Sequence, residues 1–209
     1  MKKTICILVF FFAALVFVNG DAFFIEYGFK TGVVSSNIKS DFFFTKRSKL
    51  GLDFGVFAES KKFKNFQIVA EFHYIQKGII DAYIIFDPVT YEILDMTELK
   101  HRLDYISIPV LLKLSKEYDM VLPYLMFGPR FDYLFSYRSD IYGVLFDEVN
   151  NFVLGGDFVL GTEMKISEKI SGIFELRYNF DITLSENIFN SKNEAFQVLI
   201  GFKFSDLKK

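Results

Sequence analysis

Alternation of apolar and polar residues with a period of two is the feature of this sequence that most constrains its fold. Between residues 25 and 33, odd positions hold apolar or aromatic residues and one threonine, while even positions hold glycine or charged residues. Successive side chains of a β-strand point to opposite faces, so this segment is predicted to be a strand with one apolar and one polar face. The pattern recurs in seven further segments, at residues 52–59, 66–74, 106–114, 125–135, 157–165, 174–182 and 196–204.

The two faces of these eight segments differ in charge. The apolar faces comprise 39 positions without a charged residue, whereas the 34 opposite positions hold nine acidic and six basic residues. Because 24% of the chain is charged, an even distribution would place about nine charges among the 39 positions. The contrast predicts an all-β chain in which each strand separates an apolar face from an ionic one.

The composition of the polar face indicates that it faces inward. Six glycines share this face with the charges, and glycine suits a crowded lumen better than a solvated strand, which it weakens. A membrane barrel turns its apolar face to lipid, the reverse of a soluble barrel such as a lipocalin. Charges of both signs can then pair across a narrow lumen. The predicted lumen network comprises Glu26, Lys30, Asp53, Glu71, Lys113, Arg130, Asp157, Glu163, Lys165, Glu175, Arg177 and Lys203.

The first 22 residues are typical of a secretory signal peptide. A basic start is followed by an uncharged apolar run of 14 residues, from Ile5 to Val18, and then by small residues. Cleavage after Gly20 and cleavage after Ala22 both fit, with Ala22 slightly favoured. Cys6 is the only cysteine and lies at the start of the apolar run, whereas a lipid-anchor cysteine would follow the run, which argues against a lipid anchor. We therefore divide the chain into a signal peptide (1–22) and a barrel domain (23–209), and we expect the outer membrane of a Gram-negative bacterium.

The spacing of the segments predicts an up-and-down, antiparallel, eight-stranded transmembrane barrel. Connections alternate between short and long, as in outer-membrane barrels with short periplasmic turns and longer outside loops. In lipid every backbone group must be bonded internally, so the strands must close. Eight strands leave room only for side chains, which predicts a filled lumen. Pro109 and Pro129 fall within strands, where each removes a hydrogen-bond donor, and a local bulge is expected at either.

Several stretches resemble the PorT-like outer-membrane β-barrel family, often labelled porin-like. The likeness covers nearly all of the mature chain and includes FQIVAEFHYIQKG, LDYISIPVLLKL, PYLMFGPRFDYLFS, FELRYNFDIT and FQVLIGFKF. Its most specific part is the strand from Tyr105 to Pro109, followed by Pro123-Tyr and Gly128-Pro129. The resemblance implies an eight-stranded barrel in which both strand prolines are family features, and it brings no catalytic motif.

The sequence offers little for catalysis or metal binding. Its two histidines, His73 on the polar face and His101 at the predicted outer mouth, are interpreted as a lumen-wall residue and a loop residue. We therefore expect no enzyme activity, no cofactor and no metal. A formal net charge of -2 argues against nucleic-acid binding, which normally needs a basic excess.

The predicted outside loops are the candidate contact surfaces. Phe42, Phe43 and Phe44 precede Lys46 and Arg47, a combination that suits anionic headgroups, such as lipopolysaccharide, or a protein partner. Residues 79–99 are predicted to form a hairpin that rises above the membrane, with edges open to strand addition.

We expect a monomer that is folded by the barrel assembly machinery and acts as a structural, accessory or adhesion protein through its loops. A narrow porin is the first alternative, and an outer-membrane lipid-modifying enzyme that uses His101 is the second.

Overall fold

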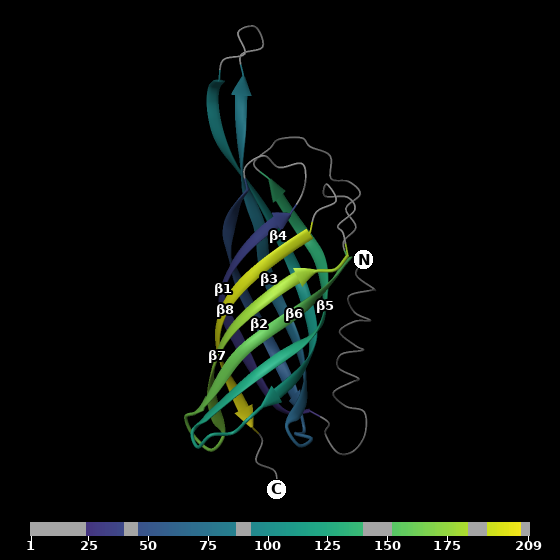
Figure 1. The fold of residues 1–209 in the computed structure, drawn as a ribbon, viewed down its shortest axis with the longest axis vertical. Coiled ribbons are helices and arrows are strands. Elements are labelled where there is room, and N and C mark those ends of the chain that lie inside the picture. The colour runs from purple at the N-terminus through teal and green to yellow at the C-terminus, as the bar shows by residue number, and fades with distance from the viewer. Residues whose placement is uncertain (1–23, 40–45, 87–92, 140–151, 184–191, 206–209) are drawn as a thin grey trace.

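The computed structural model describes residues 24–39, 46–86, 93–139, 152–183 and 192–205, which form one closed antiparallel β-barrel (Figure 1). The strands are β1 (Phe24–Lys39), β2 (Lys46–Ser60), β3 (Phe66–Phe86), β4 (Ile93–Ser115), β5 (Val121–Ser139), β6 (Phe152–Lys165), β7 (Ile170–Asp181) and β8 (Lys192–Ser205). Each strand pairs with its neighbour in sequence, and β8 closes the barrel onto β1. The predicted all-β, eight-stranded fold is confirmed. The described residues include no helix long and apolar enough to cross a membrane.

The assignment of faces from the period-two pattern is also confirmed. Large apolar side chains point outward on every strand, as with Phe127, Phe158 and Phe196, whose side chains are 46%, 51% and 66% exposed. Their strand neighbours on the other face are buried, as Met126 and Asp157 show. The outer surface is therefore an apolar band around the barrel, and the polar residues are enclosed.

The two strand prolines do not produce the bulges that we expected, and that prediction is wrong. β5 pairs with β6 in one unbroken register that includes Pro129 opposite Gly156. The registers of β4 with β3 and with β5 are the same on both sides of Pro109. Proline removes one ladder donor, but its backbone φ remains compatible with a strand, so no extra residue has to be inserted. The irregularity between β4 and β5 instead lies between Asp104 and Tyr105.

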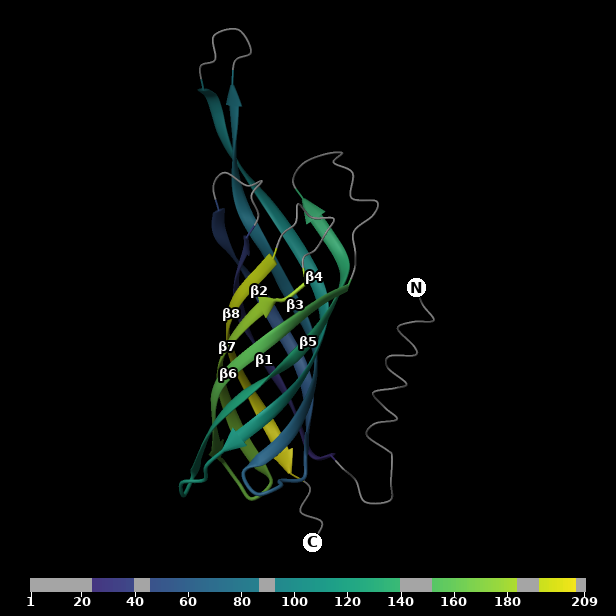
Figure 2. The same ribbon diagram turned by 45° about the vertical axis from the view of Figure 1, so that its right-hand side comes forward.

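β3 and β4 continue well beyond the rim of the barrel as a two-stranded hairpin (Figures 1 and 2). Their pairing keeps one register from Phe66 opposite Leu114 to Ile85 opposite Asp95, and a register shift precedes the last pair, Phe86 with Ile93. The hairpin predicted for residues 79–99 is thus a continuation of two barrel strands rather than a separate loop. Its tip, residues 87–92, lies outside the described residues.

Short turns connect the strands at the opposite end of the barrel, where β1 begins and β8 ends (Figure 2). Two of these turns are closed by backbone pairs, Phe63 with Phe66 and Tyr118 with Val121. In a barrel of this class, short turns mark the periplasmic side. The predicted signal peptide (1–22) and the three loop phenylalanines at 42–44 lie outside the described residues.

Candidate functional site

The lumen contains a network of charged side chains that crosses between strands. Its nine carboxylates and six cations come from all eight strands, and 14 of these 15 groups are more than nine-tenths buried. The carboxylates are Glu26, Asp53, Glu59, Glu71, Asp132, Asp157, Glu163, Glu175 and Asp181, and the cations are Lys30, Lys77, Lys113, Arg130, Arg177 and Lys203. Because buried charges are costly unless they are paired, the network is best described by its ion pairs.

Arg130 is the centre of the cluster nearest the outer end. Its guanidinium contacts carboxylates of three strands, with nitrogen–oxygen distances of 3.0 Å to Asp132, 2.8 Å to Asp157 and 2.6 Å to Asp181. Lys77 adds a second cation 2.9 Å from Asp132. The planar guanidinium presents several donors in fixed directions, which lets one side chain bind three acceptors that a lysine could not satisfy in the same geometry.

A second cluster fills the middle of the barrel. Lys30 lies 2.7 Å from Glu71 and 2.6 Å from Glu175, and Arg177 lies 2.7 Å and 3.1 Å from the same two carboxylates. Arg177 also approaches Asp157 at 3.4 Å, and Asp157 in turn binds Arg130 of the outer cluster. The two clusters therefore form one continuous network.

His73 extends the middle cluster toward β2. Its Nδ1 lies 2.6 Å from Asp53 and its Nε2 lies 3.1 Å from Glu71, and all three side chains are buried. An ionised carboxylate only accepts hydrogen bonds, so both ring nitrogens must donate for both contacts to form. The site therefore suits the imidazolium, which adds a seventh cation opposite the nine carboxylates.

The third cluster closes the periplasmic end. Lys113 contacts Glu59 at 2.8 Å and also bonds Glu163. Lys203 lies 2.5 Å from Glu163 and 3.0 Å from Glu26. Together with the clusters above, these contacts fill the barrel along its length with paired side chains, which is the filled lumen predicted for eight strands.

Two lumen glycines make room for aromatic rings from the neighbouring strand. Tyr124 is paired with Gly161, and a side chain on Gly161 would come within 2.3 Å of the Tyr124 ring. Phe57 covers Gly28 in the same way, at 2.5 Å. The Tyr124 hydroxyl then donates to Glu175 at 2.7 Å. These glycines are therefore required for ring packing inside the barrel, which explains why they share a face with the charges.

The structure brings together 11 of the 12 residues predicted for the lumen network, and Lys165 is the exception. Lys165 ends β6, is 53% exposed, and pairs at 2.6 Å with Glu117, itself 53% exposed. The period-two pattern was extended one residue too far there, because the polar face is no longer enclosed at the last residue of the strand. Lys77 was missed because the apolar–polar alternation is interrupted after Tyr74, where Ile75 lies on the lumen face and Gln76 on the outer face. Glu59, Asp132 and Asp181 had been placed on the polar face but not in the network.

Three other residues singled out in the sequence, Lys46, Arg47 and His101, are not among the 15 groups of the lumen network. Lys46 lies at the start of β2, and Arg47 pairs with Glu98 of β4 at 2.6 Å on the surface. The interpretation of His101 as a loop residue is wrong, because it lies within β4 and is buried, with its Nδ1 2.7 Å from the Tyr137 hydroxyl. Within the described ranges, no group of three or more His, Cys, Asp or Glu side chains is arranged to hold a metal ion.

Comparison with known proteins identifies the family. The family model described as "Outer membrane protein beta-barrel domain" matches residues 23–205. This chain belongs to that family. Among solved structures, Neisserial surface protein A (NspA) is similar at 13% identity with a TM-score of 0.56, over 86% of this chain and 97% of that chain. The N-terminal β-barrel domain of Pseudomonas aeruginosa OprF is similar at 8% identity with a TM-score of 0.46, over 85% of this chain and 97% of that chain. The attachment invasion locus protein Ail of Yersinia pestis is similar at 12% identity with a TM-score of 0.42, over 86% of this chain and 99% of that chain.

The family match and the closed barrel of the structure establish the fold and the location. The chain is a small eight-stranded barrel of the Gram-negative outer membrane, with its apolar band toward lipid. A search of curated proteins finds no match to this sequence.

Proposed function

We propose that this chain is a PorT-like, monomeric, non-enzymatic barrel that anchors a recognition surface in the outer membrane. The β3–β4 hairpin supplies that surface, and it binds a protein partner by strand addition. The single observation that supports this role is that, among the described residues, β3 and β4 remain paired with each other beyond the last residue at which either pairs with a barrel neighbour.

The hairpin offers two strand edges outside the barrel. Among the described residues, β2 last pairs with β3 at Asp81, and β5 last pairs with β4 at His101. From residues 82 to 86 on β3 and from 93 to 100 on β4, each strand is therefore paired on one side only. Such an edge presents a row of backbone donors and acceptors that an extended segment of another protein can use.

The filled lumen supports an anchoring role rather than transport. Arg130 and Arg177 occupy the axis of the barrel, both fully buried, and each binds carboxylates of three strands. An ion would have to break these contacts in order to pass. A steady open-state current through the wild-type chain in planar bilayers would instead favour the porin alternative.

Photo-crosslinking from the hairpin tests the proposed role. We expect a photoreactive phenylalanine at position 83 or 97 to give a discrete protein adduct on intact cells. The same group at Phe131, on the lipid-facing surface, should give none. Replacing residues 82–98 by Asn-Gly, which favours a two-residue hairpin turn, should remove the adduct from a position retained in both chains, such as Lys100. Absence of adducts from both hairpin positions, or an unchanged adduct after excision, would rule out this role.

A further inference from the structure

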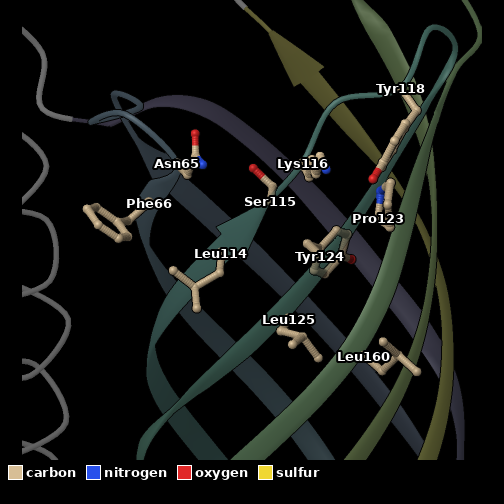
Figure 3. A pocket seen from close by; sticks show the side chains of 10 residues that line it. All are labelled: Asn65, Phe66, Leu114, Ser115, Lys116, Tyr118, Pro123, Tyr124, Leu125 and Leu160. Atoms are coloured by element: carbon tan, nitrogen blue, oxygen red, sulfur yellow. The ribbon is translucent and has the colours of Figure 1, made fainter.

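A groove lies on the outer face of the barrel near its periplasmic end (Figure 3). It has a volume of about 490 Å³, and its walls come from β3, β4, β5, β6 and the turns between β2 and β3 and between β4 and β5. Its floor is apolar and consists of Phe66, Leu114, Leu125 and Leu160. These four side chains point outward toward the lipid, whereas Ser115 and Tyr124, which also line the groove, are buried.

The edge of this groove toward the periplasm is polar and basic. Asn65, Lys116 and Tyr118 line it there (Figure 3). The Lys116 side chain is exposed, and its ammonium lies 5.2 Å from the centre of the Tyr118 ring. A single groove thus joins an apolar floor to a cationic and hydrogen-bonding edge, which is the arrangement of a phospholipid's acyl chain and headgroup.

Positive charge is concentrated on this side of the periplasmic rim. The β2–β3 turn, which ends at the groove residue Asn65, carries three exposed lysines at positions 61, 62 and 64. The turn between β6 and β7 carries one acid and one base, Glu168 and Lys169, and so has no net charge. Cations are therefore gathered beside the groove rather than spread evenly around the rim.

The acidic residues of the β4–β5 turn only partly offset these lysines. Glu117 accepts a hydrogen bond of 2.6 Å from Lys165, and this contact lowers the pKa of Glu117 and balances its charge. Asp119 is the other acidic residue of that turn, whereas four exposed lysines, at positions 61, 62, 64 and 116, lie in the two turns beside the groove. The net field at the groove edge remains positive and favours an anionic ligand.

Exposed aromatic residues mark this rim as the membrane boundary. Phe63 is 70% exposed and Tyr118 is 54% exposed, and both lie in turns. Aromatic side chains are enriched where the apolar band of a membrane barrel meets the headgroups. The groove edge therefore lies at headgroup level of the periplasmic leaflet, and the floor lies at the level of the acyl chains.

We propose that this groove is a binding site for one anionic phospholipid of the periplasmic leaflet. The phosphate lies at Lys116 within reach of the β2–β3 turn lysines, and one acyl chain lies along Leu114, Leu125 and Leu160. A basic residue beside an anionic membrane surface contributes roughly five-fold in affinity, so removal of two lysines is expected to weaken binding roughly 30-fold.

Native mass spectrometry of the folded full-length barrel tests the charge requirement, with phosphatidylglycerol as probe and phosphatidylcholine as zwitterionic reference. We expect wild type to retain one phosphatidylglycerol in preference to phosphatidylcholine. The double variant Lys62→Gln/Lys116→Gln should lose that preference. Lys169→Gln/Lys192→Gln, which removes two exposed charges away from the groove, should keep it. Equal binding of both lipids by wild type, or equal loss in both double variants, would overturn the proposal.

Filling the groove tests its location. Leu160 and Leu176 are similarly exposed on the lipid-facing surface, at 53% and 46%, but only Leu160 lines the groove. Leu160→Trp is therefore expected to lower retention of phosphatidylglycerol by roughly ten-fold, whereas Leu176→Trp should leave it unchanged. The same retention in both tryptophan variants would show that lipid associates with the whole apolar band and not with this groove.

Discussion

Replacement of Arg130 by methionine is expected to lower the free energy of unfolding by about 3–5 kcal/mol, as removal of one partner from a buried ionic contact does. The substitution removes the charged donor of three carboxylates at once, those of Asp132, Asp157 and Asp181. Lys77, Arg177 and Asn193 still contact them, but none of these can occupy the position of the guanidinium. Urea-induced unfolding of the barrel in lipid vesicles measures the change.

Lys165→Met is the matched control for this variant. It also removes a cation from an ion pair, but the Lys165–Glu117 pair is half-exposed at a turn. Exposed pairs contribute about 0–1 kcal/mol, so this variant should unfold close to wild type. If Arg130→Met and Lys165→Met proved equally stable, the lumen network would not stabilise the barrel in the way described above.

Phe158→Arg is expected to destabilise the membrane-inserted barrel by about 2–4 kcal/mol, the cost of an arginine on the lipid face near the bilayer midplane. Phe158 lies halfway along β6, is 51% exposed, and is paired with Phe127 and Tyr178 on the neighbouring strands. Met164 is equally exposed on the same face of β6 but lies close to the periplasmic end. Met164→Arg should therefore cost only about 0–1 kcal/mol.

The same vesicle unfolding assay compares the two arginine variants. A difference that follows depth is expected only if the outward face of β6 contacts acyl chains. Equal stability of Phe158→Arg and Met164→Arg, both close to wild type, would contradict that contact.

The fold was predictable because its main constraint is local. In a strand with one face toward lipid and the other toward a polar lumen, apolar and polar residues have to alternate, so residues two apart lie on the same face. The pattern failed at the strand end, as at Lys165, and where the alternation is interrupted, as by Ile75 and Gln76 before Lys77. The bulges predicted at the two prolines were wrong because the sequence shows only that each proline lacks a backbone donor. Whether a bulge forms depends on how the strand pairs with the strands on both sides of it.

The pairing inside the lumen was not predictable from the sequence. Arg130 on β5 contacts Asp181 on β7, a strand that is not its neighbour in the sheet. That contact depends on how far the strands are staggered around the closed barrel, which is a property of all eight registers together. The groove likewise combines residues of four strands, and its lining residues Phe66, Leu114 and Leu160 are far apart in the sequence.

Tryptophan fluorescence tests the central claim, the orientation of the two faces, most directly, because the chain has no tryptophan of its own. Phe54 and Phe57 both lie on β2, but Phe54 is 54% exposed on the outer face whereas Phe57 is 4% exposed in the lumen. In vesicles of phospholipid brominated on its acyl chains, we expect strong quenching of Phe54→Trp and little quenching of Phe57→Trp. Quenching of Phe57→Trp with Phe54→Trp unaffected would show that the apolar face is the inner one and would contradict the account.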